Sequence, residues 1–332
     1  MEIISFIGIV AALILIILGS VRGYSLILLS TVAALLVAAT GGVNVFENYA
    51  NVYMGGVANM VLAIGGSPIM AQGIREVEDV TSICQSLVLN MGTLEEERVE
   101  AMILAGKKAV QLGHPVILDP VGVTASAFRR ESALRILKAV RPSVIRGNAS
   151  EIHMLEQVLS GAKTGNLCGV DAVPGRWMDL TAKAAVSLEK RTGAVVVMTG
   201  TTDVVAGPER VMKIMNGHPW MGRITGSGCM LDGIIGAFCA LCAPVQGRTP
   251  AGGGGKEALG RSGDAPGCGG TQAAITEAAA MAVCAHGLCG ELAAGKAIRT
   301  GGGTGSFRMY LTDYMSMLDD GMLERGKRIE IS

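Results

Sequence analysis

The stretch with the clearest chemical potential runs from residue 223 to residue 238, where a glycine-punctuated turn leads into an apolar helix. Gly226 and Gly228 permit backbone angles that a side chain would forbid, so the amides from Gly226 to Cys229 can converge at the start of that helix. Converging amides at a positive helix end bind phosphate oxygens well. The stretch predicts an anion hole, and an ordinary glycine turn before a buried helix is the alternative.

Polar residues follow three short apolar stretches nearer the N-terminus. These clusters begin with Asp119, Arg146 and Thr199 and end at residues 122, 151 and 203. In an α/β fold, ligands gather beyond the carboxyl ends of the strands. We therefore expect the clusters to lie near the glycine turn and to form a nucleotide and metal site. Each cluster alone can also be a capped turn, with Asn148 as a helix N-cap and Asp119 in a turn before proline.

The elements that position these residues alternate between short apolar strands and helices. Strands are expected at residues 87–90, 115–119, 143–146 and 194–198, and helices at 75–86, 95–112, 131–140, 150–160 and 178–191. Gly113 is expected to end the helix before it. Two short apolar runs flank a Gly65-Gly66 turn. This alternation predicts an α/β fold in which a mostly parallel sheet carries helices on both faces.

The composition is typical of a globular protein with a large aliphatic core. Of the 332 residues, 50% are hydrophobic and only 4% are aromatic. The 28 basic and 28 acidic residues balance, so the chain offers no basic surface for nucleic acid. Among the cysteines, Cys239 and Cys242 have CxxC spacing, without a second pair or histidine at the spacing of a zinc site. We expect reduced, mostly buried thiols in a cytosolic domain.

The N-terminal part differs in character from the rest of the chain. Two uncharged apolar runs, residues 3–21 and 24–43, are each long enough to span a bilayer. A secretory signal peptide fits less well, because no basic region precedes the first run. We predict two transmembrane helices within residues 1–43, which bring residues 3–43 into contact with a membrane. A buried helical hairpin is the alternative.

Residues 44–332 form the predicted catalytic domain, which a glycine-rich segment interrupts at 245–272. Two runs of glycine break the helical pattern there and predict a loop without regular structure. Lys256 follows Gly255 in this segment but does not belong to a P-loop, because Glu257 occupies the position of the required Ser or Thr and no strand precedes it.

Seven short motifs stand in the order seen in the hydroxyethylthiazole kinase family, which the chain resembles from about residue 58 onward. They are Gly65-Gly-Ser-Pro-Ile-Met70, Leu89-Asn-Met-Gly-Thr-Leu94, Pro115-Val-Ile-Leu-Asp-Pro-Val-Gly122, Ile145-Arg-Gly-Asn-Ala-Ser-Glu151, Met198-Thr-Gly200, Asn216-Gly-His218 and Thr225-Gly-Ser-Gly-Cys229. The resemblance implies a ribokinase-like fold and phosphorylation of the hydroxyl group of 4-methyl-5-(2-hydroxyethyl)thiazole with ATP and Mg²⁺, in thiamine biosynthesis or salvage. It also implies a cytoplasmic catalytic domain that assembles as a homotrimer.

The clusters and the resemblance together give a set of expected site residues. Substrate binding is expected at Met70 and Gly226, ATP binding at Arg146, Asn148 and Thr199, metal binding at Asp119 and Glu151, and catalysis at Gly226, Gly228 and Cys229. Related sugar kinases carry an aspartate at the position of Cys229. A thiol with a pKa of about 8.5 is a poor proton acceptor unless the helix terminus lowers that pKa. Asp232, three residues later on the same helical face, is the alternative acceptor.

The N-terminal end departs from the family pattern. The first strand of the family is absent, and residues 1–57 resemble the start of a gluconate/proton-symporter-type permease. The alternatives to a thiazole kinase are therefore a kinase for another small alcohol, such as hydroxymethylpyrimidine or pyridoxal, and an inactive membrane-anchored fusion product.

Overall fold

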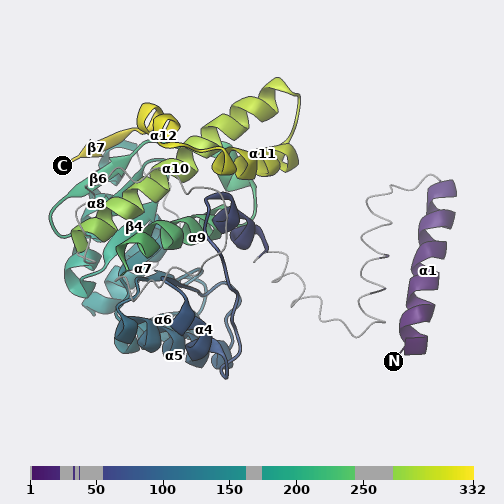
Figure 1. The fold of residues 1–332 in the computed structure, drawn as a ribbon, viewed down its shortest axis with the longest axis horizontal. Helices are drawn as coiled ribbons and strands as arrows, with labels where there is room; N and C mark the ends of the chain where they lie inside the picture. Colours follow the sequence, from purple (N-terminus) through teal and green to yellow (C-terminus); the bar gives the residue numbers. More distant parts are fainter. Residues whose placement is uncertain (1, 23–32, 34–36, 38–54, 162–173, 244–271) are drawn as a thin grey trace, which may run out of the picture. The chain divides into compact units, whose positions relative to one another are not determined.

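The computed structural model describes residues 2–22, 33, 37, 55–161, 174–243 and 272–332 (Figure 1). They belong to two compact units, residues 1–56 and 57–332. Most of the second predicted transmembrane helix, at 24–43, lies outside the described residues. The same holds for all but the last residue of the predicted glycine-rich loop at 245–272.

The N-terminal unit contains α1 (Glu2–Val21), an apolar helix. Its exposed apolar side chains are Ile7, Ile9, Val10, Leu13, Ile14, Ile17, Leu18 and Val21. Residues Ile9–Gly19 form a short apolar helical segment. Within the described residues, the helix long and apolar enough to cross a membrane is α10 (Gln272–Arg299), and 72% of its most apolar window is buried inside the protein. α10 is therefore a core helix, whereas the apolar surface of α1 is exposed.

A seven-stranded sheet forms the centre of the second unit, with its strands in the order β1-β2-β3-β4-β5-β6-β7. The strands are β1 (Leu87–Asn90), β2 (Val116–Asp119), β3 (Val144–Asn148), β4 (Val195–Thr199), β5 (Asp203–Ala206), β6 (Val211–Ile214) and β7 (Ile329–Ile331). β1 to β4 pair in parallel, whereas β4 to β7 pair antiparallel. The α/β fold is confirmed, and the sheet is mixed.

The four predicted strands are β1 to β4, each with ends within two residues of those expected. The antiparallel half was not expected. β5 starts at the last residue of a polar cluster, and β6 alternates buried and half-buried residues over only four positions. Such short strands give a weak periodic signal.

The helices of the second unit are α4 (Val77–Ile83), α5 (Glu96–Leu112), α6 (Ala127–Ala139), α7 (Ala149–Ser160), α8 (Pro174–Thr192), α9 (Ser227–Cys239), α10, α11 (Thr304–Ser316) and α12 (Asp320–Gly326). Two 3₁₀ helices, η1 (Pro219–Arg223) and η2 (Ala240–Cys242), flank α9. Gly113 ends α5 with a φ of 72°, as predicted. α6 begins earlier than expected, because the Ser126 side chain caps it. Residues 55–63 are helical and precede the turn at Gly65.

The helices form two layers, one on each face of the sheet. Parallel neighbours joined in sequence require right-handed crossovers, which place their connecting helices on one face. Accordingly α5 to α8 pack on one face and α9 and α10 on the other (Figure 1). Alternate residues of β4 face opposite sides of the sheet. Val195 and Val197 pack with α9 and α10, whereas Val196 and Met198 pack with α5 to α8.

Candidate active site

Four polar side chains lie at or close to the carboxyl ends of β1 to β4, on the face that α9 and α10 cover. They belong to Asn90, Asp119, Arg146 and Thr199. Strand residues two positions apart share a face, and the residues two positions earlier, 88, 117, 144 and 197, pack in the core beneath α9 and α10. The strand register places Asn90 directly beside Asp119. The sheet therefore aims these polar groups at the start of α9.

Arg146 is the cation of this cluster and is only 9% exposed. One terminal nitrogen donates to Oδ2 of Asp119 at 3.3 Å and the other to Oγ1 of Thr199 at 3.1 Å. Its Nε lies 3.8 Å from Oδ1 of Asp232. All three guanidinium nitrogens therefore face groups of the protein.

The first turn of α9 lies against this guanidinium. Gly226, the residue before α9, has a φ of 87°, which favours glycine. A Cβ added at Gly228 would lie 2.6 Å from both terminal nitrogens of Arg146. The first intrahelical bond runs from the Met230 amide to the Gly226 carbonyl, and no side chain of the described residues caps the helix. The turn places the free amide end of a helix beside a buried positive charge.

Asn90 connects the strands with α9. Its Oδ1 accepts the amide of Gly92 at 2.8 Å, which fixes the orientation of the side chain. Its Nδ2 then faces Oδ2 of Asp119 at 2.9 Å, Oδ2 of Asp232 at 3.2 Å and Sγ of Cys229 at 3.2 Å. An amide group has two hydrogens for these three acceptors. Asn90 therefore holds the thiol and both carboxylates close together.

The predicted metal ligands differ in how their oxygens are engaged. Both oxygens of Glu151 accept backbone amides, from Gly122 at 2.9 Å and from Asn148 at 2.8 Å. The Asn148 side chain in turn accepts the Glu151 amide at 3.0 Å, which completes a capping box at the start of α7. By contrast, Oδ1 of Asp119 is buried without a hydrogen-bond partner among the described residues.

One group in the described part of the chain has the composition of a metal site. The ligand atoms of Asp119, Cys229 and Asp232 all lie within 4.8 Å of one another. The Asn90 amide nitrogen already stands between them. Among the described residues, Oδ1 of Asp119 and Oδ1 of Asp232 are both buried without a hydrogen-bond partner, although Oδ1 of Asp232 lies 3.8 Å from Nε of Arg146. Unpaired carboxylate oxygens suit a hard divalent cation.

Burial and like charges control protonation in the cluster. Burial, together with the carboxylates of Asp232 and Asp119, raises the pKa of the Cys229 thiol to about 12. Burial and the neighbouring Asp119 also raise the pKa of Asp232 well above its usual range. Burial would lower the pKa of Arg146, but its ion pairs with Asp232 and Asp119 outweigh this and raise it. Cys229 is therefore a neutral thiol near pH 7, and Arg146 is a permanent cation.

Met70, an expected substrate-binding residue, has an exposed side chain. Met70 lies in the segment that follows the helical residues 55–63, and its side chain is 44% exposed. The cluster also contains two residues to which the sequence motifs assigned no firm role, Asn90 and Asp232. Asn90 ends a parallel strand. Ligands gather beyond the carboxyl ends of such strands, so this position could have identified Asn90 as it did Asp119.

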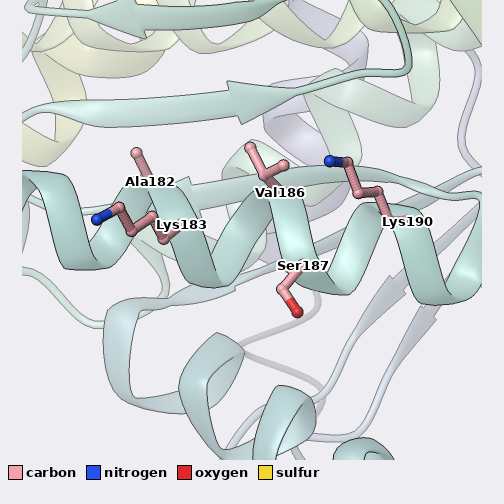
Figure 2. Close-up of a pocket in the computed structure, with 5 residues that line it drawn as sticks. All are labelled: Ala182, Lys183, Val186, Ser187 and Lys190. Carbon is pink, nitrogen blue, oxygen red and sulfur yellow. The ribbon is translucent and has the colours of Figure 1, made fainter.

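A hollow on the outside of α8 is separate from the cluster (Figure 2). It is lined by Ala182, Lys183, Val186, Ser187 and Lys190, which all belong to one helix. Figure 2 shows Ser187 pointing away from Ala182 and Val186, and its hydroxyl donates to Glu156 at 2.9 Å. None of the lining residues comes from the carboxyl edge of the sheet.

Known proteins resemble this chain over most of its length. The sequence profile of the hydroxyethylthiazole kinase family matches residues 44–249. A hydroxyethylthiazole kinase of Clostridium acetobutylicum is 40% identical over 273 residues, 82% of this chain and 89% of the relative. A hydroxyethylthiazole kinase of Desulfovibrio desulfuricans is 40% identical over 287 residues, which cover 83% of this chain and 88% of the relative. The structure of a hydroxyethylthiazole kinase protein from Pyrococcus horikoshii superposes with a TM-score of 0.66 at 27% identity, covering 85% of this chain and 90% of that one.

Proposed function

This chain belongs to the hydroxyethylthiazole kinase family and phosphorylates the hydroxyl group of 4-methyl-5-(2-hydroxyethyl)thiazole with ATP, and we propose that the transfer takes place at the first turn of α9. The observation that carries this location is the contact between Gly228 and the buried Arg146 guanidinium. Helix amides and a fixed cation converge there, and phosphoryl transfer depends on such preorganised positive groups.

Arg146 and Thr199 supply the nucleotide side of the proposed site. Arg146 donates to Thr199, so both side chains lie on the same part of the sheet edge. The capping box uses Oδ1 of Asn148, and its exposed side chain is proposed to contact the nucleotide at the start of α7. Met70 and Gly226 are proposed to contact the thiazole alcohol. The exposed side chain of Met70 is available for such a contact.

Asp119 is the proposed principal ligand of Mg²⁺, through its unpaired Oδ1. Oδ1 of Asp232 has no hydrogen-bond partner among the described residues but lies 3.8 Å from the Arg146 guanidinium, and Glu151 is the remaining carboxylate of the set. A bound Mg²⁺ would shield the negative charge of the phosphate chain. The charge balance supports a cation, because three buried carboxyl groups lie around the single positive charge of Arg146, and the raised pKa of Asp232 reflects negative charge that Arg146 alone does not compensate.

Cys229 is proposed to stand next to the substrate hydroxyl. Its sulfur lies 4.0 Å from Oδ2 of Asp119, at the start of α9. Because burial keeps the thiol protonated near neutral pH, alignment and electrostatic stabilisation provide most of the catalysis. Asp232 is fully buried and faces Asn90 and Arg146 rather than an open space. Its proposed role is that of a counter-charge.

The test is a phosphorylation assay with ATP and three alcohols: the thiazole alcohol, hydroxymethylpyrimidine and pyridoxal. We expect turnover of the thiazole alcohol, with the other two at least tenfold poorer in kcat/KM. A higher kcat/KM with hydroxymethylpyrimidine or pyridoxal would show that the thiazole alcohol is not the preferred substrate. Absence of turnover with all three, in a folded protein, would support the inactive fusion product.

Residues 44–332, which include the whole second unit, are proposed to be a cytoplasmic catalytic domain, and α1 is proposed to place residues 3–43 in a membrane. The exposed apolar surface of α1 supports a lipid environment. A homotrimer is the proposed assembly of the catalytic domain. Exposed Leu62, Ile69, Met70 and Ile74 provide apolar surface for such an assembly, and light scattering that gives the mass of a monomer would exclude it.

A further inference from the structure

The segment between β6 and α9, residues 215–226, carries the motif Asn216-Gly-His218, which has no part in the site described above. The segment ends at the glycine turn, so its position sets the position of the proposed phosphate-binding amides. The side chain of His218 caps η1 by accepting the amide of Trp220. Gly217 has a φ of 140°, a backbone angle suited to glycine.

Asn216 fastens the start of this segment to a distant part of the chain. The residue is only 5% exposed. Its Nδ2 donates to the carbonyl of Gly326 at 2.9 Å, and its Oδ1 accepts the amide of Arg328 at 2.8 Å. These bonds tie the segment to the chain just before β7.

Glu291, on α10, accepts hydrogen bonds from residues 215–226 and from the chain just before β7. Its Oε1 accepts the amide of Gly217 at 2.7 Å and Nδ2 of Asn216 at 3.3 Å. The guanidinium of Arg328 donates to both of its oxygens. One carboxylate therefore joins the segment, the chain before β7 and α10. We call Asn216, Gly217, Glu291 and Arg328 the latch.

α10 also approaches the segment closely beside the latch. A Cβ at Gly287 would lie 2.7 Å from the Asn216 backbone, and one at Gly290 would lie 2.5 Å from the sulfur of Met221. Trp220 packs edge-on against the buried ring of Phe307, with ring centroids 5.9 Å apart. The segment is therefore held at its start and along η1, which leaves it little freedom before the turn.

We propose that Glu291 is a positioning residue for the phosphate-binding turn at Gly226 to Cys229, and that it acts through the latch. The inference rests on the proposed function of that turn. Catalytic donors must be held close to their productive geometry by supporting contacts. Loss of the latch therefore affects the transition state more than the binding of substrates.

The test compares Glu291→Ala with Glu277→Ala in the full chain. Glu277 also lies on α10, where its carboxylate pairs with Arg210 at 2.7 Å, so its removal deletes an ion pair of the same helix without touching the latch. Glu291→Ala is expected to lower kcat about tenfold, less than the ~10²- to 10³-fold loss of an oxyanion donor. The KM values for ATP and thiazole alcohol are expected to change less than about threefold, as for a group that acts in the transition state. Glu277→Ala is expected to match the wild type.

Two further measurements separate positioning from folding. Glu291→Gln keeps an oxygen for the Gly217 amide and is expected to recover most of the lost kcat, which also provides a test if Glu291→Ala fails to fold. Amide hydrogen exchange, measured without substrate, is expected to be faster for residues 216–229 in Glu291→Ala but not in Glu277→Ala.

Equal kcat values for the two alanine variants, or unchanged exchange in residues 216–229, would overturn the role of Glu291. If the wild type fails to phosphorylate thiazole alcohol, the proposed function is wrong. The exchange experiment still decides whether the latch holds the turn.

Discussion

In the candidate site, one buried cation lies among three carboxyl groups. Arg146 faces Asp119 and Asp232, and the charge of Glu151 also helps to raise the pKa of Arg146. Burial makes such an imbalance costly unless further positive groups approach. A bound metal ion would satisfy this need together with the helix amides of the α9 turn, so phosphate and cation are expected to bind together.

Replacing Arg146 tests its two roles. Arg146→Ala is expected to weaken ATP binding by about 1.5–3 kcal/mol, the value of a charge-assisted hydrogen bond. It is also expected to lower the melting temperature, because two buried carboxylates lose their partner. The double variant Arg146→Ala with Asp232→Asn removes one of these charges, so it is expected to regain stability without regaining ATP affinity. Unchanged ATP affinity by calorimetry would make Arg146 purely structural.

Replacing Cys229 tests the proton acceptor. Cys229→Asp is expected to raise kcat, because a carboxylate accepts a proton more readily than a neutral buried thiol. Cys229→Ala is expected to lose less than the ~10²- to 10⁴-fold that removal of a general base costs. Steady-state kinetics measures both values. A folded but inactive Cys229→Ala enzyme would make the thiol essential, and no gain in Cys229→Asp would place the acceptor elsewhere.

At the scale of elements, the contact between α9 and β3 sets the distance between the first turn of α9 and the Arg146 guanidinium. Arg146 comes from β3 and Gly228 from α9, and the missing side chain of Gly228 allows the guanidinium to lie against the helix. Much of this arrangement follows from sequence rules. Strand-end polarity and alternation predict that Asp119, Arg146 and Thr199 share one edge, and Gly226 predicts the turn.

Gly228→Ala tests this contact. The new methyl group would meet a guanidinium that Asp119, Asp232 and Thr199 hold in place, so the turn must shift. We expect at least a tenfold lower kcat, since misplaced catalytic groups lose rate steeply. Gly222→Ala is the matched control, because nothing lies within 4 Å of a Cβ there. Equal kcat values for the two variants would show that the close approach is irrelevant to catalysis.

α10 contains a buried histidine that links stability to pH. Burial, with a smaller effect from Arg146, lowers the pKa of His286 to about 3. The unfolded chain therefore binds a proton below about pH 6.5 that the folded chain does not, so stability is lost as pH falls from about 6.5 toward 3. At pH 5 the loss is about 2 kcal/mol.

His286→Met is expected to reduce this acid sensitivity, because methionine fills a buried site without taking up a proton. Chemical denaturation at pH 7.5 and pH 5 measures the effect, with the wild type as the control. An equal change in the free energy of unfolding for both proteins would show that another group titrates.

At the scale of the whole molecule, the parts of the fold that sequence patterns missed depend on distant contacts. Asn90 and Asp232 meet only because β1 and α9, far apart in the chain, pack together. β7 joins β6 across more than a hundred residues, and no local period marks such a pairing. β1 to β4 were predictable because each contains a short run of apolar residues next in sequence to a helical stretch.

The N-terminal unit gives the prediction at this scale. The full chain is expected to stay with membranes after carbonate extraction, because apolar side chains of α1 are exposed. A chain that begins at Asn44 is expected to remain in the supernatant. Recovery of the full chain as a monodisperse protein without detergent would contradict membrane insertion.

Trp220 is a fluorescent side chain in residues 215–226, the segment between β6 and α9. Its ring packs edge-on against Phe307 and His218. Indole emission responds to the polarity and motion of its surroundings, and in sequence Trp220 lies between Gly217 of the latch and the proposed phosphate-binding turn. The other tryptophan is Trp177. With Trp177 replaced by phenylalanine, the protein carries a single built-in optical reporter, whose emission follows the segment as nucleotide arrives.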